Sequence, residues 1–222
     1  MTADSKFDLK KKRIRAFFQT LENLAKHKDE IDKTQEKFME EGLIYRQMTL
    51  PVENITKEFE ENLKKKVETN MLHAKIRRVT DTDLDILKDL YNRAWLSSNT
   101  PFRPITVDDL EKVYHDPDTI IFIGKVYGMD AGFVILDREG EDNEYGIIAG
   151  LGVIPRFQRK GLGLVLGIKA WNYFKKEGVK KLRCEVYREN ERSYQFIKSL
   201  GFQETGQKSY TSKDFEFPTP NE

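Results

Sequence analysis

Cysteine, histidine and long apolar runs are scarce in this chain of 222 residues. The single cysteine, Cys184, excludes an internal disulfide and zinc sites built from several thiolates. The histidines His27, His73 and His115 show no spacing typical of metal ligands, so we predict no metal site. Because no apolar run can span a bilayer and the polar N-terminus lacks a signal-peptide core, we expect a cytoplasmic protein.

An excess of charge of either sign is also missing, since the chain has 38 basic and 37 acidic residues and a formal net charge of +1. Binding to nucleic acid or to an anionic membrane surface is favoured by a basic excess. The basic runs at 10–13 and 64–66 lie among acidic residues, and we interpret them as solvated helix faces. We therefore predict no nucleic-acid partner and no membrane partner.

Glycine and proline are rare before residue 72, where only Gly42 and Pro51 occur. Apolar residues recur at intervals of three and four before Gly42 and after Pro51, with Lys28 and Gln35 interrupting the first series, which is the pattern of amphipathic helices. We predict an N-terminal helical hairpin over residues 1–72, with Gly42 ending the first helix and Pro51 opening the second. The hairpin needs a partner surface, either the rest of the chain or a second copy, and we favour a homodimer. The two apolar stripes are Ile14, Phe17, Leu21, Leu24, Ile31 and Phe38, then Val52, Ile55, Phe59, Leu63 and Val67.

Strand and helix patterns alternate from His73 onward and predict one α+β domain over residues 73–217, with a flexible tail at 218–222. Two short strands are expected after the last helix. The predicted strands are 74–79, 120–127, 131–136, 145–154 and 182–187, and the main predicted helices begin near Thr80, Thr106, Gly161 and Glu191.

The most informative segment is an apolar strand that stops at Pro155, followed by a basic turn and by Gly161 and Gly163 at the start of an apolar helix. A helix start has unpaired N–H groups and partial positive charge, and glycines let a ligand approach the backbone. This pattern predicts a phosphorylated ligand. A dinucleotide fingerprint does not fit, because Leu166 occupies the third glycine position, and no P-loop sequence is present.

Gln158, Gly161 and Gly163 fill the pattern Gln/Arg-x-x-Gly-x-Gly/Ala, in which the chain resembles the GNAT superfamily of acyl-CoA-dependent N-acyltransferases. The resemblance covers residues 74–211 and is strongest over 145–202, where the order of elements matches that of the family. It implies a GNAT-like mixed, mostly antiparallel sheet with splayed central strands flanked by helices. It also implies acetyl-CoA as acyl donor and a primary amine as acceptor.

The resemblance implies that amides of residues 159–164 hold the CoA pyrophosphate, while the amides of Leu151 and Val153 meet the pantetheine and the thioester carbonyl. Asn190 is expected to touch the pantetheine arm and also to cap the following helix, with Ser193 facing the same cleft. The implied cofactor-binding residues are Leu151, Val153, Gln158, Arg159, Lys160, Gly161, Leu162, Gly163, Leu164, Asn190 and Ser193.

The groups that transfer protons match the family less well. Many GNAT proteins have a tyrosine seven residues after the asparagine, where this chain has Ile197. Tyr194, one helical turn earlier, is our candidate acid, and packing is its alternative role. Ile147 replaces the glutamate that some members carry midway along the strand. Glu144 at the start of this strand is our candidate base, and Glu185 on the next strand is a second candidate.

The acceptor side is implied to include Trp95, Phe102 and Arg103, which look most similar to GNAT proteins acting on small amines; a polypeptide amine stays open. We predict an N-acetyltransferase that works by direct attack in a ternary complex. The alternatives are an acyl-CoA-binding regulatory module that signals through the hairpin, and a coiled-coil adaptor.

Overall fold

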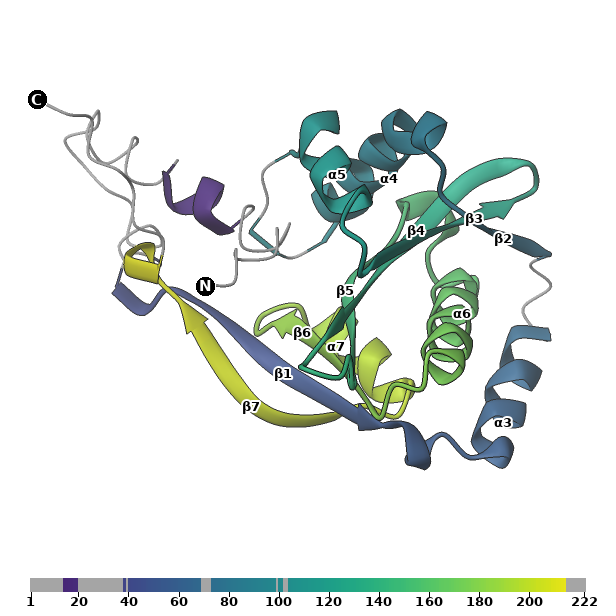
Figure 1. Cartoon of the computed structure of the whole chain (residues 1–222). Coiled ribbons are helices and arrows are strands. Elements are labelled where there is room, and N and C mark those ends of the chain that lie inside the picture. Colours follow the sequence, from purple (N-terminus) through teal and green to yellow (C-terminus); the bar gives the residue numbers. More distant parts are fainter. Residues whose placement is uncertain are drawn as a thin grey trace, which may run out of the picture.

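A seven-stranded sheet organises the part of the chain that the computed structural model describes, which is residues 14–19, 38, 40–68, 73–98, 100–101 and 104–214 (Figure 1). The strand order is β2-β3-β4-β5-β6-β1-β7. Neighbouring strands are antiparallel except β5 and β6, which are parallel. The strands are β1 (Leu43–Pro51), β2 (Ala74–Arg78), β3 (Thr119–Val126), β4 (Met129–Glu139), β5 (Tyr145–Val153), β6 (Lys181–Tyr187) and β7 (Gln203–Tyr210). This confirms the mixed, mostly antiparallel sheet expected of a GNAT-like fold.

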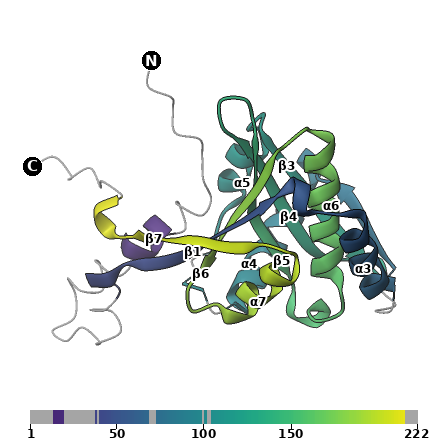
Figure 2. The ribbon, with the colours of Figure 1, turned by 90° about the horizontal axis from the view of Figure 1, so that it is seen from below.

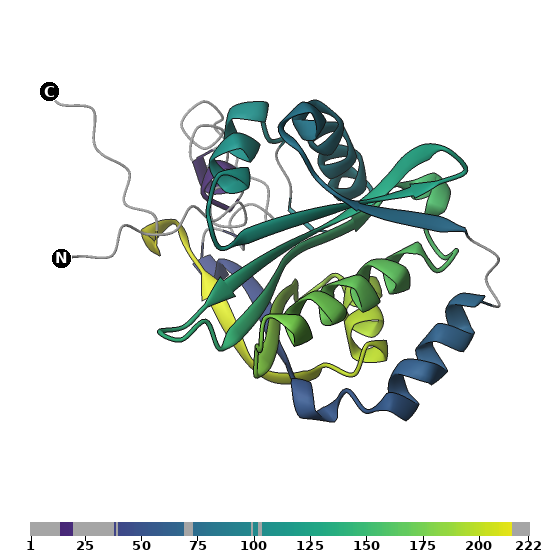
Figure 3. The same cartoon turned by 45° about the vertical axis from the view of Figure 1, so that its right-hand side comes forward.

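Helices cover both faces of this sheet. The helices α4 and α5 lie on one face, while α6 and α3 lie on the other (Figure 3). Along the described residues, no helix combines the length and the apolar character needed to cross a bilayer. The helices are α3 (Lys57–Glu68), α4 (Leu84–Leu96), α5 (Val107–Tyr114), α6 (Leu162–Lys176) and α7 (Glu191–Ser199).

Local hydrogen bonds start the helices where the sequence predicts. Thr106 and Asp109 form a reciprocal capping box at α5, in which the Asp109 carboxylate accepts from the Thr106 amide at 3.0 Å. Before α4, the Asp83 carboxylate accepts from the Thr80 amide at 2.9 Å and from Arg77 Nη2 at 2.8 Å. The hydrogen bond from Arg77 holds the pKa of Asp83 well below its usual range.

The strand β1 corrects the predicted connection of the N-terminal hairpin. Residues 43–51 were expected to join two helices, yet they pair antiparallel with β6 on one side and β7 on the other (Figure 2). The alternation of buried residues changes phase between Tyr45 and Met48, next to an irregular register at Gln47 and Met48. This break hides the two-residue period by which a strand is recognised in a sequence.

The second predicted helix is present as α3, but it begins at Lys57 rather than at Pro51, which ends β1. Its stripe residues Phe59 and Leu63 pack on the chain's own core. Leu63 is buried, and the Phe59 ring lies 5.7 Å from the Trp171 ring of α6. Phe59 and Leu63 of this stripe are therefore covered by the chain itself, and the homodimer stays a prediction.

Of the first predicted helix, residues 14–19 are helical, and Ile14 and Phe18 form a small cluster with Leu43, Tyr45 and other side chains of the β1 end. Most of that helix and the 218–222 tail lie outside the described residues. A single strand, β7, stands where two short strands were expected at the C-terminal end.

Candidate active site

The two central strands separate at the site. β5 and β6 pair only from Tyr145–Ile147 to Lys181–Arg183, after which β6 keeps its pairing with β1 while β5 follows β4. The sheet therefore opens along the C-terminal half of β5, as the predicted splayed strands require. A ligand that enters this opening meets main-chain groups of β5 directly.

Glycines shape the open part of β5. The register between β4 and β5 shifts at Ile135 and Leu136 so that Ala149 is extra, which makes a β-bulge in β5. Gly152 is required by packing, because a Cβ there would lie 2.5 Å from the Phe133 ring and 2.8 Å from the Ala94 Cβ. The bulge and this close packing fix the position of the C-terminal end of β5 at the opening.

A turn with two left-handed residues joins β5 to α6. Arg159 has φ 58° and Gly161 has φ 85°. Val165 donates the first intrahelical hydrogen bond of α6, to Gly161 O at 3.1 Å, and no side chain caps the helix at Gly161 in the described chain. The amides of Leu162, Gly163 and Leu164 precede that bond, so they supply the unpaired donors and the partial positive charge of a helix start.

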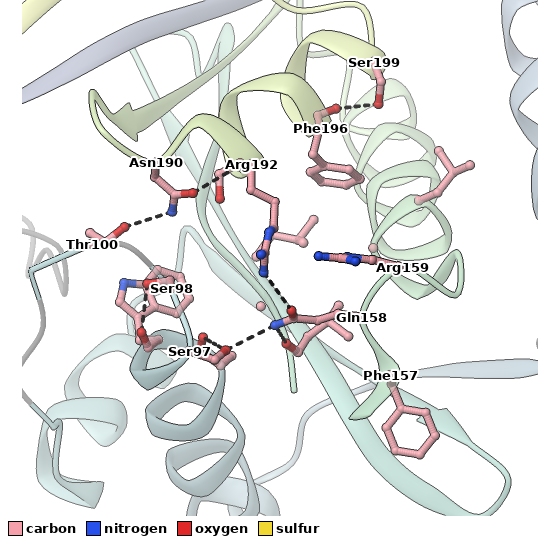
Figure 4. A pocket seen from close by; sticks show the side chains of 18 of the residues that line it. Ser97, Ser98, Thr100, Phe157, Gln158, Arg159, Asn190, Arg192, Phe196 and Ser199 are labelled. Carbon is pink, nitrogen blue, oxygen red and sulfur yellow. Dashed lines mark hydrogen bonds between the residues drawn. The ribbon is translucent and has the colours of Figure 1, made fainter. Parts of the chain in front are cut away.

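Gln158 ties three elements together around this turn. Its Nε2 donates to Val153 O at 2.9 Å and to Ser97 Oγ at 3.2 Å, and its Oε1 accepts from Arg192 Nη1 at 3.4 Å (Figure 4). The side chain of Arg159 points toward the centre of the same space (Figure 4). Gln158 therefore positions the turn, and Arg159 places a positive charge in this space.

Asn190 plays the predicted capping role at α7. Its Oδ1 accepts from the Ser193 amide at 3.1 Å, while its Nδ2 donates to Thr100 Oγ1 at 3.0 Å. Asn190 is buried, with 8% of its surface exposed. Because both ends of the amide are engaged, the α7 start is held against the segment that follows α4.

These elements enclose a cavity of about 680 Å³. Among the described residues, no group of three or more histidine, cysteine or acidic side chains is arranged to hold a metal ion. Of the residues that the sequence predicted for the site, ten line the cavity: Trp95, Leu151, Val153, Gln158, Arg159, Gly161, Gly163, Leu164, Asn190 and Ser193. Lining residues that the sequence did not point to include Leu63, Lys66, Ser97, Thr100, Arg192, Phe196 and Ser199.

Two predicted cofactor residues, Lys160 and Leu162, are not part of the cavity lining. Leu162 is fully buried, and its Cδ1 and Cδ2 atoms approach Gly124 and Gly132. The Lys160 ammonium lies 5.7 Å from the Phe157 ring centroid. For Leu162, the prediction concerns only the amide, which the helix start leaves at the cavity side.

The structure does not bring the two predicted catalytic residues to the cavity. The Arg46 guanidinium carbon lies 3.9 Å from the centre of the Tyr194 ring, and Tyr194 is absent from the lining within the described chain. Glu144 precedes β5, and seven extended residues at about 3.3 Å each separate it from Leu151 by roughly 23 Å. Its carboxylate accepts from the Asp142 amide at 3.3 Å.

Two titratable side chains of β6, Glu185 and Tyr187, are not part of the cavity lining. Glu185 accepts a hydrogen bond from the Tyr210 hydroxyl at 3.0 Å, on the β1–β7 side of the sheet. Burial, together with the nearby Glu189 carboxylate, raises the pKa of Tyr187, so its phenol keeps its proton. The predicted acceptor residues Phe102 and Arg103 lie outside the described residues.

A model of the Acetyltransferase (GNAT) family matches residues 84–202, more than half of the chain. The chain belongs to the GNAT family of acetyltransferases. It is also 30% identical, over 136 residues, to an uncharacterized N-acetyltransferase of Methanocaldococcus jannaschii. That alignment covers 58% of this chain and 60% of the relative's length. The prediction of an N-acetyltransferase is confirmed at the level of the family.

Solved structures with the same fold include two acetyltransferases with ligands. One is AAC(6′)-Iy in complex with the bisubstrate analogue CoA-S-monomethyl-acetylneamine, with TM-score 0.53, 20% identity, and coverage of 62% of this chain and 96% of that chain. The other is the PaiA N-acetyltransferase of Thermoplasma acidophilum in complex with coenzyme A, with TM-score 0.52, 19% identity, and coverage of 62% and 99%. At these identities the likeness establishes the fold.

Proposed function

We propose that this GNAT enzyme transfers an acetyl group from acetyl-CoA to a primary amine, by direct attack within a ternary complex. The observation that carries the proposal is the continuity of one cavity, which runs from the uncapped start of α6 to the open edge of β5. The amides at the start of α6 can bind phosphate and the main chain of β5 can bind the acyl end, so one cavity can hold one elongated ligand such as acetyl-CoA.

The start of α6 suits the diphosphate of the coenzyme. The amides of Leu162, Gly163 and Leu164 are hydrogen-bond donors before the first intrahelical bond, and the helix dipole adds favourable charge. Arg159 points into the cavity beside them, and a guanidinium binds phosphate oxygens in a bidentate manner. CoA-bound structures of the same fold support this assignment.

The open edge of β5 suits the thioester. Attack of the amine nitrogen on the thioester carbonyl forms a tetrahedral oxyanion. The C–S bond then breaks, the attacking nitrogen loses a proton to water, and the sulfur takes up a proton. We assign stabilisation of the oxyanion to the main-chain amides around Leu151 and Val153, which line the cavity where β5 has left β6. The same arrangement holds both reactants in place, and such positioning supplies much of the rate in group transfer.

The acceptor end is bounded by an aromatic stack. Trp95 lines the cavity and lies parallel to Tyr91, with ring centroids 4.6 Å apart, and Phe133 packs against both rings. A rigid apolar wall next to polar groups suits a small amine with both apolar and hydroxyl-bearing parts. The bisubstrate analogue bound to AAC(6′)-Iy supports a small-molecule acceptor of this kind. We assign no proton transfer to Tyr194 or Glu144.

Gly163→Glu tests the coenzyme end of the proposal. The new carboxylate would sit on the first turn of α6 and repel the diphosphate, so the affinity for acetyl-CoA should fall at least about tenfold, which corresponds to about 1.4 kcal/mol. Asn172→Glu adds the same charge to an exposed position of the same helix, away from the cavity, and should bind as the wild type does.

Isothermal titration with acetyl-CoA measures both variants, and thermal melting verifies that they are folded. Equal affinity in Gly163→Glu and wild type would contradict the assigned diphosphate site. The transfer step is measured separately, as release of the CoA thiol in the presence of a panel of primary amines. Tight binding of acetyl-CoA without thiol release with any amine would contradict the transferase reaction.

A further inference from the structure

The cavity has a wall that the family segment does not supply. Leu63 and Lys66 of α3 line it, and α3 lies before residue 84, where the match to the GNAT family begins. Phe196 and Ser199 of α7 line the same cavity, on the side away from Ser97 and Ser98 (Figure 4). An N-terminal helix of this chain thus completes a cavity whose other walls belong to the acetyltransferase segment.

Buried contacts hold α3 in this position. Phe59 packs on Trp171, a Cβ on Gly201 would lie 3.1 Å from the Phe59 ring, and Leu63 is 3% exposed. Glu60 and Lys175 form an ion pair at 2.5 Å. The wall is therefore anchored to α6 and to the segment after α7.

The direction of α3 brings its last turn to the start of α6. Figures 1 and 3 show α3 and α6 side by side and running in opposite senses. Phe59, near the start of α3, contacts Trp171, in the second half of α6. Lys66 lies seven residues after Phe59, and at about 1.5 Å per residue this places it about 10 Å along the axis, at the level of Leu164.

We propose that Lys66 binds the 3′-phosphate on the ribose of coenzyme A. This inference rests on the proposed function, in which the amides at the start of α6 hold the diphosphate. The pantetheine arm then runs from the diphosphate toward Trp95, so the nucleotide occupies the opposite end of the cavity, which Lys66 and Ser199 line. The 3′-phosphate is the anionic group of that end of the coenzyme, and a lysine ammonium binds phosphate as a point charge.

The expected size of the effect follows from exposure. Lys66 is exposed, so its attraction to a phosphate is weakened by water and by salt. Lys66→Gln should therefore lower the affinity for CoA by about three- to tenfold, rather than abolish it. The variant should fold normally, because glutamine is polar, as an exposed position requires, and is a good helix former.

Isothermal titration with two ligands, CoA and 3′-dephospho-CoA, tests the contact. The wild type should bind CoA more tightly than 3′-dephospho-CoA, and Lys66→Gln should remove most of that difference while binding 3′-dephospho-CoA as the wild type does. Lys64→Gln is the matched control, since Lys64 is exposed on the same turn of α3 but does not line the cavity, and it should keep the wild-type preference.

Two results would overturn the inference alone: an equal loss for both ligands, which would place Lys66 on the diphosphate, or no loss for either ligand. A wild-type protein that binds neither CoA nor 3′-dephospho-CoA would overturn the proposed function itself, and this inference with it.

Discussion

Two glycines of β5, two residues apart on the same face, should respond in opposite directions to alanine. At Gly152 the added Cβ would lie 2.5 Å from the Phe133 ring and 2.8 Å from the Ala94 Cβ, distances that the structure cannot accommodate without movement. Both neighbours are buried, and Phe133 is stacked against Tyr91 and Trp95. Overpacking of this kind lowers the free energy of unfolding by about 1–3 kcal/mol.

Gly150 is the matched control. A Cβ there would have Trp95, Ile135 and Phe133 as neighbours at 3.6 to 3.7 Å, which is ordinary van der Waals contact. Gly150→Ala should therefore fit and raise the free energy of unfolding by about 0.4–1 kcal/mol, because alanine restricts the unfolded chain. The two single-methyl variants should thus differ by roughly 1.5–4 kcal/mol, the sum of the two opposite effects.

Urea denaturation followed by tryptophan fluorescence measures this difference. With a slope of about 1–3 kcal/mol per molar urea, a loss of 2 kcal/mol moves the midpoint by roughly 0.7–2 M. Gly152→Ala should also weaken binding of acetyl-CoA, since a displaced Phe133 pushes on Trp95, which lines the cavity. If Gly152→Ala were as stable as Gly150→Ala, the packing argument for the glycine-rich strand would be refuted.

Two further predictions concern stability. Asp83→Asn should cost about 1–3 kcal/mol at pH 7, because the charged acceptor of Arg77 is lost. The folded pKa of Asp83 lies below its unfolded value near 3.9, so this stabilisation is complete above about pH 5 and is lost as the pH falls. The difference in melting temperature between the wild type and Asp83→Asn should therefore shrink in acid, and a difference that stayed constant down to pH 2 would contradict this reasoning. Removal of residues 1–72 deletes β1, the described neighbour of β7, and should abolish cooperative thermal unfolding, whereas a folded remainder that bound acetyl-CoA would show that β1 is dispensable.

The features that were predictable from the sequence are those that neighbouring residues create among themselves. The Thr106–Asp109 box and the Asn190 cap each depend on a hydrogen bond over three residues, so the residue types alone indicate them. The turn from Gln158 to Gly163 is equally local, since a glycine with positive φ and a helix start suffice to present amides to a ligand.

Long-range pairing produced what the sequence could not indicate. β1 is a strand because β6 and β7, more than a hundred residues later, leave a place between them, and its irregular alternation conceals this. Glu144 is distant from the cavity because it precedes β5, whose opposite end lines the cavity, and the Tyr194 ring lies against Arg46 of that same β1. The contribution of α3 to the cavity has the same origin. An apolar stripe on a helix predicts that one face is buried, but it does not indicate which surface covers that face. Local bonding thus determines the turn from Gln158 to Gly163, while the assembly of distant segments determines which side chains surround it.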